Sequence, residues 1–189
     1  MLKIEFPALQ VEVRYDALRF SGDGLFTSGS SVLQSKKRKI VERVGSLLID
    51  STKCFTLNNQ EIQYNHCNPD GILVEAIQIE GHTDSDGQED YNLTLSTSRA
   101  NAAFFAMKNH QKNLLTYQNI RGQSIFSVAG YGEMRPITQN SSSKNKAENR
   151  RIDLRLIMYT PRNSEQVEDF KMRIAAGLKL LIEGVQSDP

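Results

Sequence analysis

Apolar residues recur along this chain with two different periods, and each change of period marks an expected change of secondary structure. In residues 9–20 apolar and polar residues alternate, which predicts a pair of strands or one bent strand. Residues 51–71 follow neither period, so we expect an irregular insertion there. Between them, residues 34–50 follow the helical period, with an apolar face made of Ile40, Val41, Val44, Leu47 and Leu48.

The middle of the chain predicts a strand, a helix and a second strand. Residues 72–80 form the most strand-like run of the sequence. A turn at residues 87–90 leads into a helix that we expect over 93–108. Residues 109–124 are polar and indicate a connection with one short helical piece, and residues 125–129 predict the next strand.

The C-terminal part predicts a loop, a strand and a helix. Residues 139–149 are rich in Ser, Asn and Lys, which is typical of a mobile polar loop. Residues 150–159 alternate as a strand should, with Ile152, Leu154, Leu156 and Met158 on one face. Ser164 is the expected cap of a third helix, whose apolar stripe consists of Val167, Phe170, Ile174, Leu178 and Leu181. This order of elements predicts an α+β sandwich in which helices cover a small sheet.

Composition and charge narrow the picture only a little. The length of 189 residues supports one domain with room for an appendage, and the 39% hydrophobic and 24% charged contents are ordinary for a globular protein. The net charge of +1 provides no overall field that would draw the chain to nucleic acid or to a membrane. No window approaches the roughly 18 apolar residues of a membrane span. Because no signal peptide is evident, we expect either a cytoplasmic protein or a fragment of a longer chain.

Two cysteines, Cys54 and Cys67, flank a polar stretch of the expected insertion. In an oxidising compartment they can close a disulfide, which for a loop of this size contributes about 3 kcal/mol. Two unpaired thiols in a reduced protein are the second interpretation. A metal site that adds His66 is less well supported, because the usual number and spacing of ligands are lacking.

The chemistry of the chain centres on an acid and a base. Asp84 follows the apolar strand that ends at Gly81, and Arg99 lies on the next helix. An Arg fork binds a carboxylate through two parallel hydrogen bonds, and an Asp accepts from an ammonium, so the pair suits a zwitterionic ligand. The alternative is a structural salt bridge that only ties strand to helix.

The helical period places Arg99 more closely. At about 100° per residue, one stripe of this helix carries Asn92, Ser96, Arg99 and Ala103. An adjacent, apolar stripe carries Leu93, Ala100, Phe104 and Met107, and we expect it to face the core. Arg99 is therefore predicted at the border between core and solvent, with its stem packed and its fork directed at a ligand.

Other candidate groups carry weaker signals. His82, Thr83, Asp84 and Ser85 are residue types that also occur in hydrolase active sites. A hydrolase needs a nucleophile on a constrained turn, however, and the sequence has no Gly-x-Ser-x-Gly motif to supply one. His82, Asp84 and Asp86 alternate like metal ligands, a pattern too common to predict a site, so we expect neither metal nor cofactor. The basic run of residues 36–39 at the start of the first helix is expected to be a solvated face.

Several motifs occur together in a recognisable order. They are Glu80-Gly81-His82-Thr83-Asp84-Ser85-Asp86-Gly87, Tyr91-Asn92-Leu93 with Leu95-Ser96 and Arg99-Ala100, Gly130-Tyr131-Gly132 with Pro136, and Asn149-Arg150-Arg151-Ile152. In this combination residues 10–160 resemble the OmpA-like C-terminal domain, which also occurs in MotB stator proteins and peptidoglycan-associated lipoproteins. The resemblance implies a βαβαββ two-layer sandwich over residues 1–162, with insertions at 51–71 and 109–124, followed by a helical extension over 163–189.

The resemblance also implies a function. Domains of this family bind peptidoglycan non-covalently, and their conserved Asp and Arg hold the diaminopimelate of the stem peptide. Those positions are Asp84 and Arg99 here, and Asn92, Arg150 and Thr83 belong to motifs that line the same pocket. Diaminopimelate carries an amine and a carboxylate on one carbon, which suits the acid and base described above. The resemblance implies a binding protein rather than an enzyme.

Departures from the compact family domain suggest a subgroup. The two insertions and the Thr-Asp-x-Asp-Gly variant resemble the ZorB stator subunit of anti-phage systems, and residues 18–30 resemble the MotB lead-in. This implies a periplasmic fragment of a single-pass inner-membrane protein that forms a homodimer and works with a MotA-like or ZorA-like motor partner through a missing N-terminal membrane segment. We expect no nucleic-acid partner. The alternatives are an outer-membrane tether of the OmpA or lipoprotein type and, with less support, a cell-wall hydrolase with His82 as its base.

Overall fold

The computed structural model describes residues 11–13, 17–21, 25–58, 61–62, 68, 72–166, 168 and 172. Over these residues the strands are β1 (Val11–Val13), β2 (Ala17–Ser21), β3 (Leu57–Asn58), β4 (Glu61–Ile62), β5 (Val74–Gly81), β6 (Tyr117–Gln118), β7 (Phe126–Gly130) and β8 (Arg151–Met158). The α-helices are α2 (Ser35–Thr52), α3 (Glu89–His110) and α4 (Ser143–Asn149), and short 3-10 turns cover Lys53–Phe55 and Leu114–Thr116. No helix in these ranges is long and apolar enough to span a membrane.

The main sheet has five strands in the order β1-β2-β8-β5-β7. β5 and β7 run parallel, with Gly81 opposite Gly130, and the other neighbours are antiparallel. The sheet is therefore mixed. The alternation in residues 9–20 forms two antiparallel strands, which confirms the strand pair rather than one bent strand.

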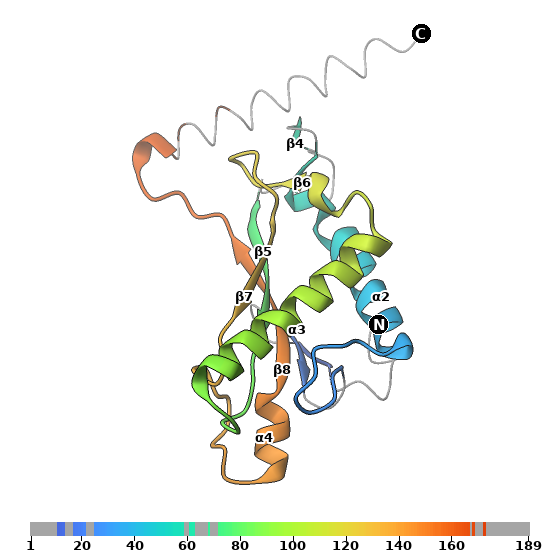
Figure 1. Cartoon of the computed structure of the whole chain (residues 1–189). Coiled ribbons are helices and arrows are strands. Elements are labelled where there is room, and N and C mark those ends of the chain that lie inside the picture. The colour runs from blue at the N-terminus through green and yellow to red at the C-terminus, as the bar shows by residue number, and fades with distance from the viewer. Residues whose placement is uncertain are drawn as a thin grey trace.

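Helix α3 lies across β5 and β7, and α2 packs against α3 (Figure 1). The apolar core between helix and sheet includes Ile77, Ile79, Ala103, Met107, Ile152 and Leu154. Two paired glycines allow the close approach, because a Cβ on Gly81 would lie 2.0 Å from Ser96 O and one on Gly130 would lie 2.0 Å from Thr97 Oγ1. The α+β sandwich predicted from the sequence is thus the observed fold.

The two expected insertions meet in a second small sheet with the order β4-β3-β6. β3 comes from the first insertion and pairs antiparallel with β6 of the second, through Leu57 with Gln118 and Asn58 with Tyr117. The prediction of an irregular insertion at 51–71 was wrong to this extent. The strands are only two residues long, too short for the alternating pattern to reveal them. The short helical piece predicted within 109–124 is present at Leu114–Thr116.

Three further predictions need correction. Residues 139–149 are not simply a loop, because Ser142 Oγ accepts from the backbone N of Asn145 at 3.2 Å and starts α4. Helix α3 begins at Glu89, inside the expected turn. At the C-terminus, helix begins at residue 164 and Asn163, not Ser164, is the cap, because Asn163 Oδ1 accepts from Gln166 N at 2.8 Å. Most of the stripe from Val167 to Leu181 lies outside the described residues.

Candidate functional site

The polar stripe of α3 faces inward. Asn92 and Ser96 are fully buried and Arg99 is 3% exposed, so the prediction that Arg99 lies at the border with solvent was wrong. Leu93 of the stripe expected to face the core is 39% exposed instead. The other members of that stripe do face the core, because Ala100 and Met107 are buried and Phe104 packs against the core. The polar stripe is buried as well, because polar side chains can be buried where they find hydrogen-bond partners. Ser96, for example, donates to Leu93 O at 2.8 Å and accepts from Gly132 N at 2.9 Å.

Asp84 lies just beyond the end of β5 and is 6% exposed. Its Oδ1 accepts from the backbone N of Asp86 at 3.1 Å, which fixes the loop. Its Oδ2 accepts from Arg150 Nη1 at 2.6 Å, a charge-assisted hydrogen bond. Arg150 directly precedes β8, which pairs with β5. In the part of the chain that the structure describes, Asp84 therefore forms its ion pair with Arg150, and not with Arg99.

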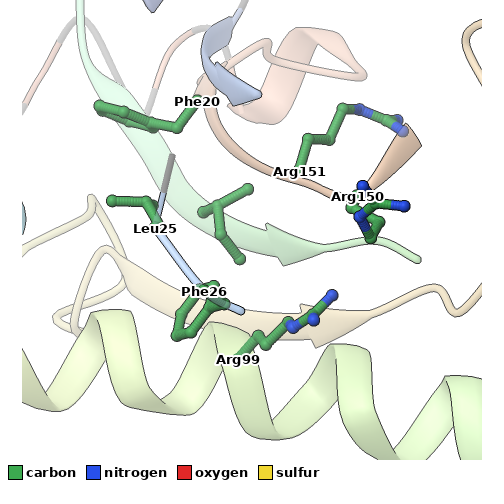
Figure 2. A pocket seen from close by; sticks show the side chains of 7 residues that line it. Phe20, Leu25, Phe26, Arg99, Arg150 and Arg151 are labelled. Carbon is green, nitrogen blue, oxygen red and sulfur yellow. The ribbon is translucent and has the colours of Figure 1, made fainter. Parts of the chain in front are cut away.

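Arg99 is held by residues 25–30, the segment between β2 and α2 that we call the strap. Arg99 Nε donates to Ser30 O at 2.9 Å and Nη2 donates to Thr27 O at 3.1 Å. Its guanidinium carbon lies 5.5 Å from the centre of the Phe26 ring. Figure 2 shows Phe26 beside the Arg99 side chain and Arg150 across the same small cavity, which is lined by Phe20, Leu25, Phe26, Arg99, Arg150, Arg151 and Ile152.

Asn92 and Thr83 lie close to the same loop but have different environments. Asn92 Nδ2 donates to Asp84 O at 3.3 Å and to Glu133 Oε2 at 2.8 Å. Asn92 therefore positions the loop that carries Asp84. Thr83 is buried, and its backbone N donates to Gly132 O at 2.8 Å, whereas its hydroxyl has no hydrogen-bond partner among the described residues. All five residues predicted for the site are thus gathered around the end of β5.

A buried charge network lies behind the site. Asp153 accepts from Arg19 Nε at 2.9 Å and from Arg151 Nε at 3.0 Å. Glu80 accepts from Arg155 Nε at 2.8 Å and from Nη2 at 3.1 Å. The sheet register explains the arrangement, because Arg19 pairs with Asp153 and Asp153 pairs with Glu80 across β2, β8 and β5. The network braces the strand ends that carry Asp84 and Arg150.

The same network sets the protonation of its members. Burial by itself would raise the pKa of Glu80, but hydrogen bonding and the positive charge of Arg155 outweigh it and lower the pKa from 4.5 to about 2. We attribute the effect chiefly to Arg155, because His82 Nε2 lies 3.8 Å from Glu80 Oε2, beyond hydrogen-bond distance. Burial lowers the pKa of His82, and the charge of Arg151 acts in the same direction.

Glu80, His82 and Asp153 are also the one described cluster that offers three ligand atoms for a metal, within 4.8 Å of one another. The cluster does not suit a cation. Both carboxylates are already bound by arginines, and a divalent ion would add to the positive charge of Arg19, Arg151 and Arg155. His82 is 1% exposed and stacks on Tyr131 with ring centres 5.3 Å apart. A catalytic base must come within hydrogen-bond distance of its substrate, and His82 is too buried for that.

The sequence motifs assigned no role to the charged residues of this network, and two contacts at the rim of the site were not predicted. Lys146 Nζ donates to Asp86 Oδ1 at 2.6 Å, which joins α4 to the Asp84 loop. Arg135 stacks over Tyr131 at 3.7 Å. One available signal was the charged residues inside apolar strands, such as Arg19, Glu80 and Asp153, because charges in such positions are rare unless paired.

The disulfide prediction concerns the opposite end of β5. Cys54 is disulfide-bonded, and Cys67, which lies outside the described residues, is the only other cysteine of the chain. Asn68 anchors this region, because its Nδ2 donates to Cys54 O at 3.0 Å and to Ile72 O at 2.7 Å. Ile72 precedes β5. The cystine therefore lies near the beginning of the strand whose end carries the site.

Comparison with known protein families gives one match. Residues 70–150 match the OmpA family. This range contains Thr83, Asp84, Asn92, Arg99 and Arg150, and so all of the predicted site residues.

Curated relatives agree with this match. The probable lipoprotein YiaD of Escherichia coli is 35% identical over 145 residues, which cover 75% of this chain and 58% of YiaD. Outer membrane porin F of Pseudomonas aeruginosa is 39% identical over 75 residues, 40% of this chain and 19% of the porin. The peptidoglycan-associated lipoprotein of Pseudomonas putida is 30% identical over 42% of both chains. The chain thus spans at most about three fifths of these relatives.

Solved structures agree at the level of the fold. A structure of the periplasmic domain of Helicobacter pylori MotB aligns with a TM-score of 0.59 and 16% identity, over 87% of this chain and 88% of that one. The cell wall anchor of the type VI secretion system (T6SS) from Pseudomonas aeruginosa aligns with a TM-score of 0.57 and 18% identity, over 83% and 92% of the two chains. Both alignments cover more of this chain than the matched family segment does.

Proposed function

Because residues 70–150 form an OmpA family domain, we propose that this chain binds peptidoglycan non-covalently and recognises the diaminopimelate of the stem peptide. One observation carries the proposal. Asp84, from the end of β5, is paired with Arg150, and Arg150 lines the same cavity as Arg99 from α3. Two cations thus line one small space, and one of them is paired with the acid Asp84, an arrangement that suits a ligand group with one ammonium and one carboxylate.

Each residue has a role in this proposal. Arg99 binds the carboxylate of the free end of diaminopimelate, and Asp84 accepts from its ammonium. Arg150 holds the Asp84 carboxylate in place and adds positive charge for the ligand carboxylate. Asn92 and Thr83 shape the loop that carries Asp84. The buried state of His82 supports binding rather than hydrolysis.

The cellular role that we propose is an anchor between a membrane complex and the cell wall. We propose that the chain is the periplasmic part of a MotB-like stator or of a ZorB-like stator of an anti-phage defence system. In this proposal it forms a homodimer and joins a motor partner through an inner-membrane helix. The alignment with MotB over most of the chain supports this choice. A disulfide at Cys54 supports an oxidising compartment such as the periplasm. We also propose residues 1–162 as the domain and 163–189 as an extension of it.

An outer-membrane tether is the second candidate. It is favoured by the names of the relatives with the higher sequence identity, which are an outer membrane porin and lipoproteins. Both candidates share the same wall-binding site, so they differ in the anchor and not in the ligand.

Sedimentation with purified peptidoglycan sacculi tests the shared proposal. We expect the wild-type protein to pellet with sacculi, and Asp84→Asn and Arg99→Lys to remain largely in the supernatant. Arg99→Lys keeps the charge but loses the planar fork. Arg121→Lys is the matched control, because Arg121 also pairs with an acid, Glu75 near the beginning of β5, but lies away from the site. If both site variants pellet like the wild type, the proposal is wrong.

A further inference from the structure

We propose that the strap and the ligand carboxylate compete for the same edge of the Arg99 guanidinium, so that ligand binding releases the strap. The inference rests on the proposed function and adds a conformational step to it. In the absence of ligand, the strap occupies the position of the ligand carboxylate on Arg99 and closes the site. A ligand carboxylate then replaces it.

The competition follows from which atoms the strap uses. Arg99 donates from Nε to Ser30 O and from Nη2 to Thr27 O. Nε and Nη2 form one edge of the planar guanidinium, and this edge presents two parallel N–H groups that match a carboxylate. Two backbone carbonyls therefore occupy the positions that the two oxygens of a carboxylate would take.

Burial indicates that something has to move before a ligand binds. Arg99 is 3% exposed and Asp84 is 6% exposed, although both are the proposed ligand contacts. The cavity beside Arg99 is small, and Leu25 and Phe26 of the strap form part of its wall (Figure 2). The polar part of the strap lies on the outside, because Thr27, Ser28 and Gly29 are all exposed. The outer part of the strap thus covers Arg99 and is itself exposed to solvent.

Among the described residues, few hydrogen bonds besides those of Arg99 hold that outer part in place, and one of them runs from Val32 N to Ser30 Oγ at 3.1 Å. Ser30 N donates to Thr27 O at 3.1 Å, and the exposed Tyr91 hydroxyl donates to Gly29 O at 3.3 Å. Leu25 and Phe26 are buried and anchor the beginning of the strap, and the buried Leu33 anchors the chain after it. Gly29 has a φ of +67°, a conformation that residues with a side chain rarely adopt. The strap can therefore open between two fixed points while the core stays intact.

The exchange is favourable for a charged ligand. A carboxylate carries a full negative charge and offers two oxygens to the planar fork, so it binds the guanidinium more strongly than two neutral carbonyls do. Because only molecules with an open strap can bind, the apparent dissociation constant equals the intrinsic one divided by the open fraction. Loosening the strap should consequently tighten ligand binding. If the strap only positioned Arg99 for the ligand, loosening it would weaken binding instead.

Titration calorimetry with a diaminopimelate-containing muropeptide tests this inference. We expect Gly29→Ala, which strains the strap at its positive φ, to bind about fivefold more tightly than the wild type. Tyr91→Phe, which removes the hydroxyl contact without backbone strain, should bind more tightly by a smaller factor. Gly122→Ala is the matched control, because Gly122 also has a positive φ of +71° but has no neighbour within 4 Å of the added Cβ. It should bind like the wild type.

Hydrogen exchange gives a second, independent readout. We expect the amide of Ser30 to exchange faster when the muropeptide is bound, whereas ligand binding ordinarily protects amides. Equal or weaker binding by Gly29→Ala and Tyr91→Phe, or protection of Ser30, would overturn the strap inference and leave the proposed function standing. If neither the wild type nor Gly29→Ala binds the muropeptide, the proposed function fails and the strap inference fails with it.

Discussion

The charged residues around the end of β5 divide into two groups with different tasks. Asp84, Arg99 and Arg150 line or border the cavity, and we assign ligand binding to them. Glu80 and Asp153 lie behind it and are each bound by arginines through side-chain hydrogen bonds. The second group contributes to stability, and it holds the strand ends from which the first group projects.

Asp153 is the residue of the second group whose loss should cost most. Asp153→Ala leaves Arg19 and Arg151 buried without their shared carboxylate, so we expect the free energy of unfolding to fall by about 3–5 kcal/mol. Asp86→Ala removes an ion pair whose carboxylate is 66% exposed, and should cost about 0–1 kcal/mol. Urea denaturation of both variants checks the difference. Equal losses would mean that the buried network does not brace the sheet.

His82 should make stability depend on pH. Burial keeps its pKa in the folded protein below 6.5, so the unfolded chain binds a proton near pH 6.5 that the folded chain does not. The stability is therefore complete above pH 6.5 and falls as the pH drops below it, by at most about 1.4 kcal/mol per pH unit. Charges from Glu80, Asp153 and Arg151 act on the same ring.

Unfolding of His82→Gln between pH 7 and pH 5 checks this prediction. We expect the variant to lose most of the pH dependence in this window, whatever its absolute stability. His110→Gln, at the exposed end of α3, is the control and should keep it. If the free energy of unfolding of His82→Gln still falls between pH 7 and pH 5, the pH dependence belongs to another group.

At the scale of elements, the position of α3 on the sheet decides the geometry of the site. Helix α3 supplies Asn92, Ser96 and Arg99, whereas Asp84 follows β5. The distance between the two is set by the glycine pair Gly81 and Gly130, on which the helix backbone rests. Glycine is therefore required at these two motif positions by the packing of α3, and not by contact with the ligand.

Gly81→Ala tests this dependence. The added Cβ would lie 2.0 Å from Ser96 O, so α3 has to shift, and we expect a loss of roughly 1–3 kcal/mol or more in unfolding free energy together with weaker binding to sacculi. Gly122→Ala, in open space, should leave binding unchanged. Wild-type binding by Gly81→Ala would show that the site tolerates a displaced helix.

At the scale of the whole molecule, the two insertions with the disulfide lie at one end of β5 and the proposed site lies at the other. The strand has eight residues and so spans roughly 25 Å. Cys54, Asn68 and the small sheet of β4, β3 and β6 lie near its beginning, and Asp84 lies beyond its end. The described residues of the two insertions thus support the fold at the end of β5 away from the site.

Removal of the cystine should therefore separate stability from binding. We expect Cys54→Ser to lower the free energy of unfolding by about 3 kcal/mol, the value for a loop of this size. Its sedimentation with sacculi should match that of the wild type under conditions where it is folded. A variant that is folded but fails to bind would contradict the separation.

The sequence predicted the architecture better than the faces and the contacts. Periodicity located every long element, because β5, β8, α2 and α3 each contain several turns or alternations of pattern. It missed β3 and β6, whose two residues carry no period, and α4, whose polar composition resembled a loop. Local pattern alone does not reveal pairing between distant short segments.

The site illustrates the same limit. The motifs identified Asp84 and Arg99, but amphipathicity placed Arg99 at a solvent border, because the rule assumes that polar side chains face water. The burial of Arg99 depends on the strap, which lies about 70 residues earlier in the sequence. The pairing of Asp84 with Arg150 likewise depends on the register of β8 beside β5. Such contacts follow from topology and not from the residues of one segment.

The most direct test of the central claim compares two stem peptides that differ in one group. Calorimetry should measure binding of a diaminopimelate-containing tripeptide and of the same peptide with lysine, which lacks the second carboxylate. We predict that the wild type binds the diaminopimelate peptide at least about tenfold more tightly, and that Arg99→Lys loses most of this preference, because a charged hydrogen bond contributes about 1.5–3 kcal/mol. Equal affinity of the wild type for both peptides would contradict the account.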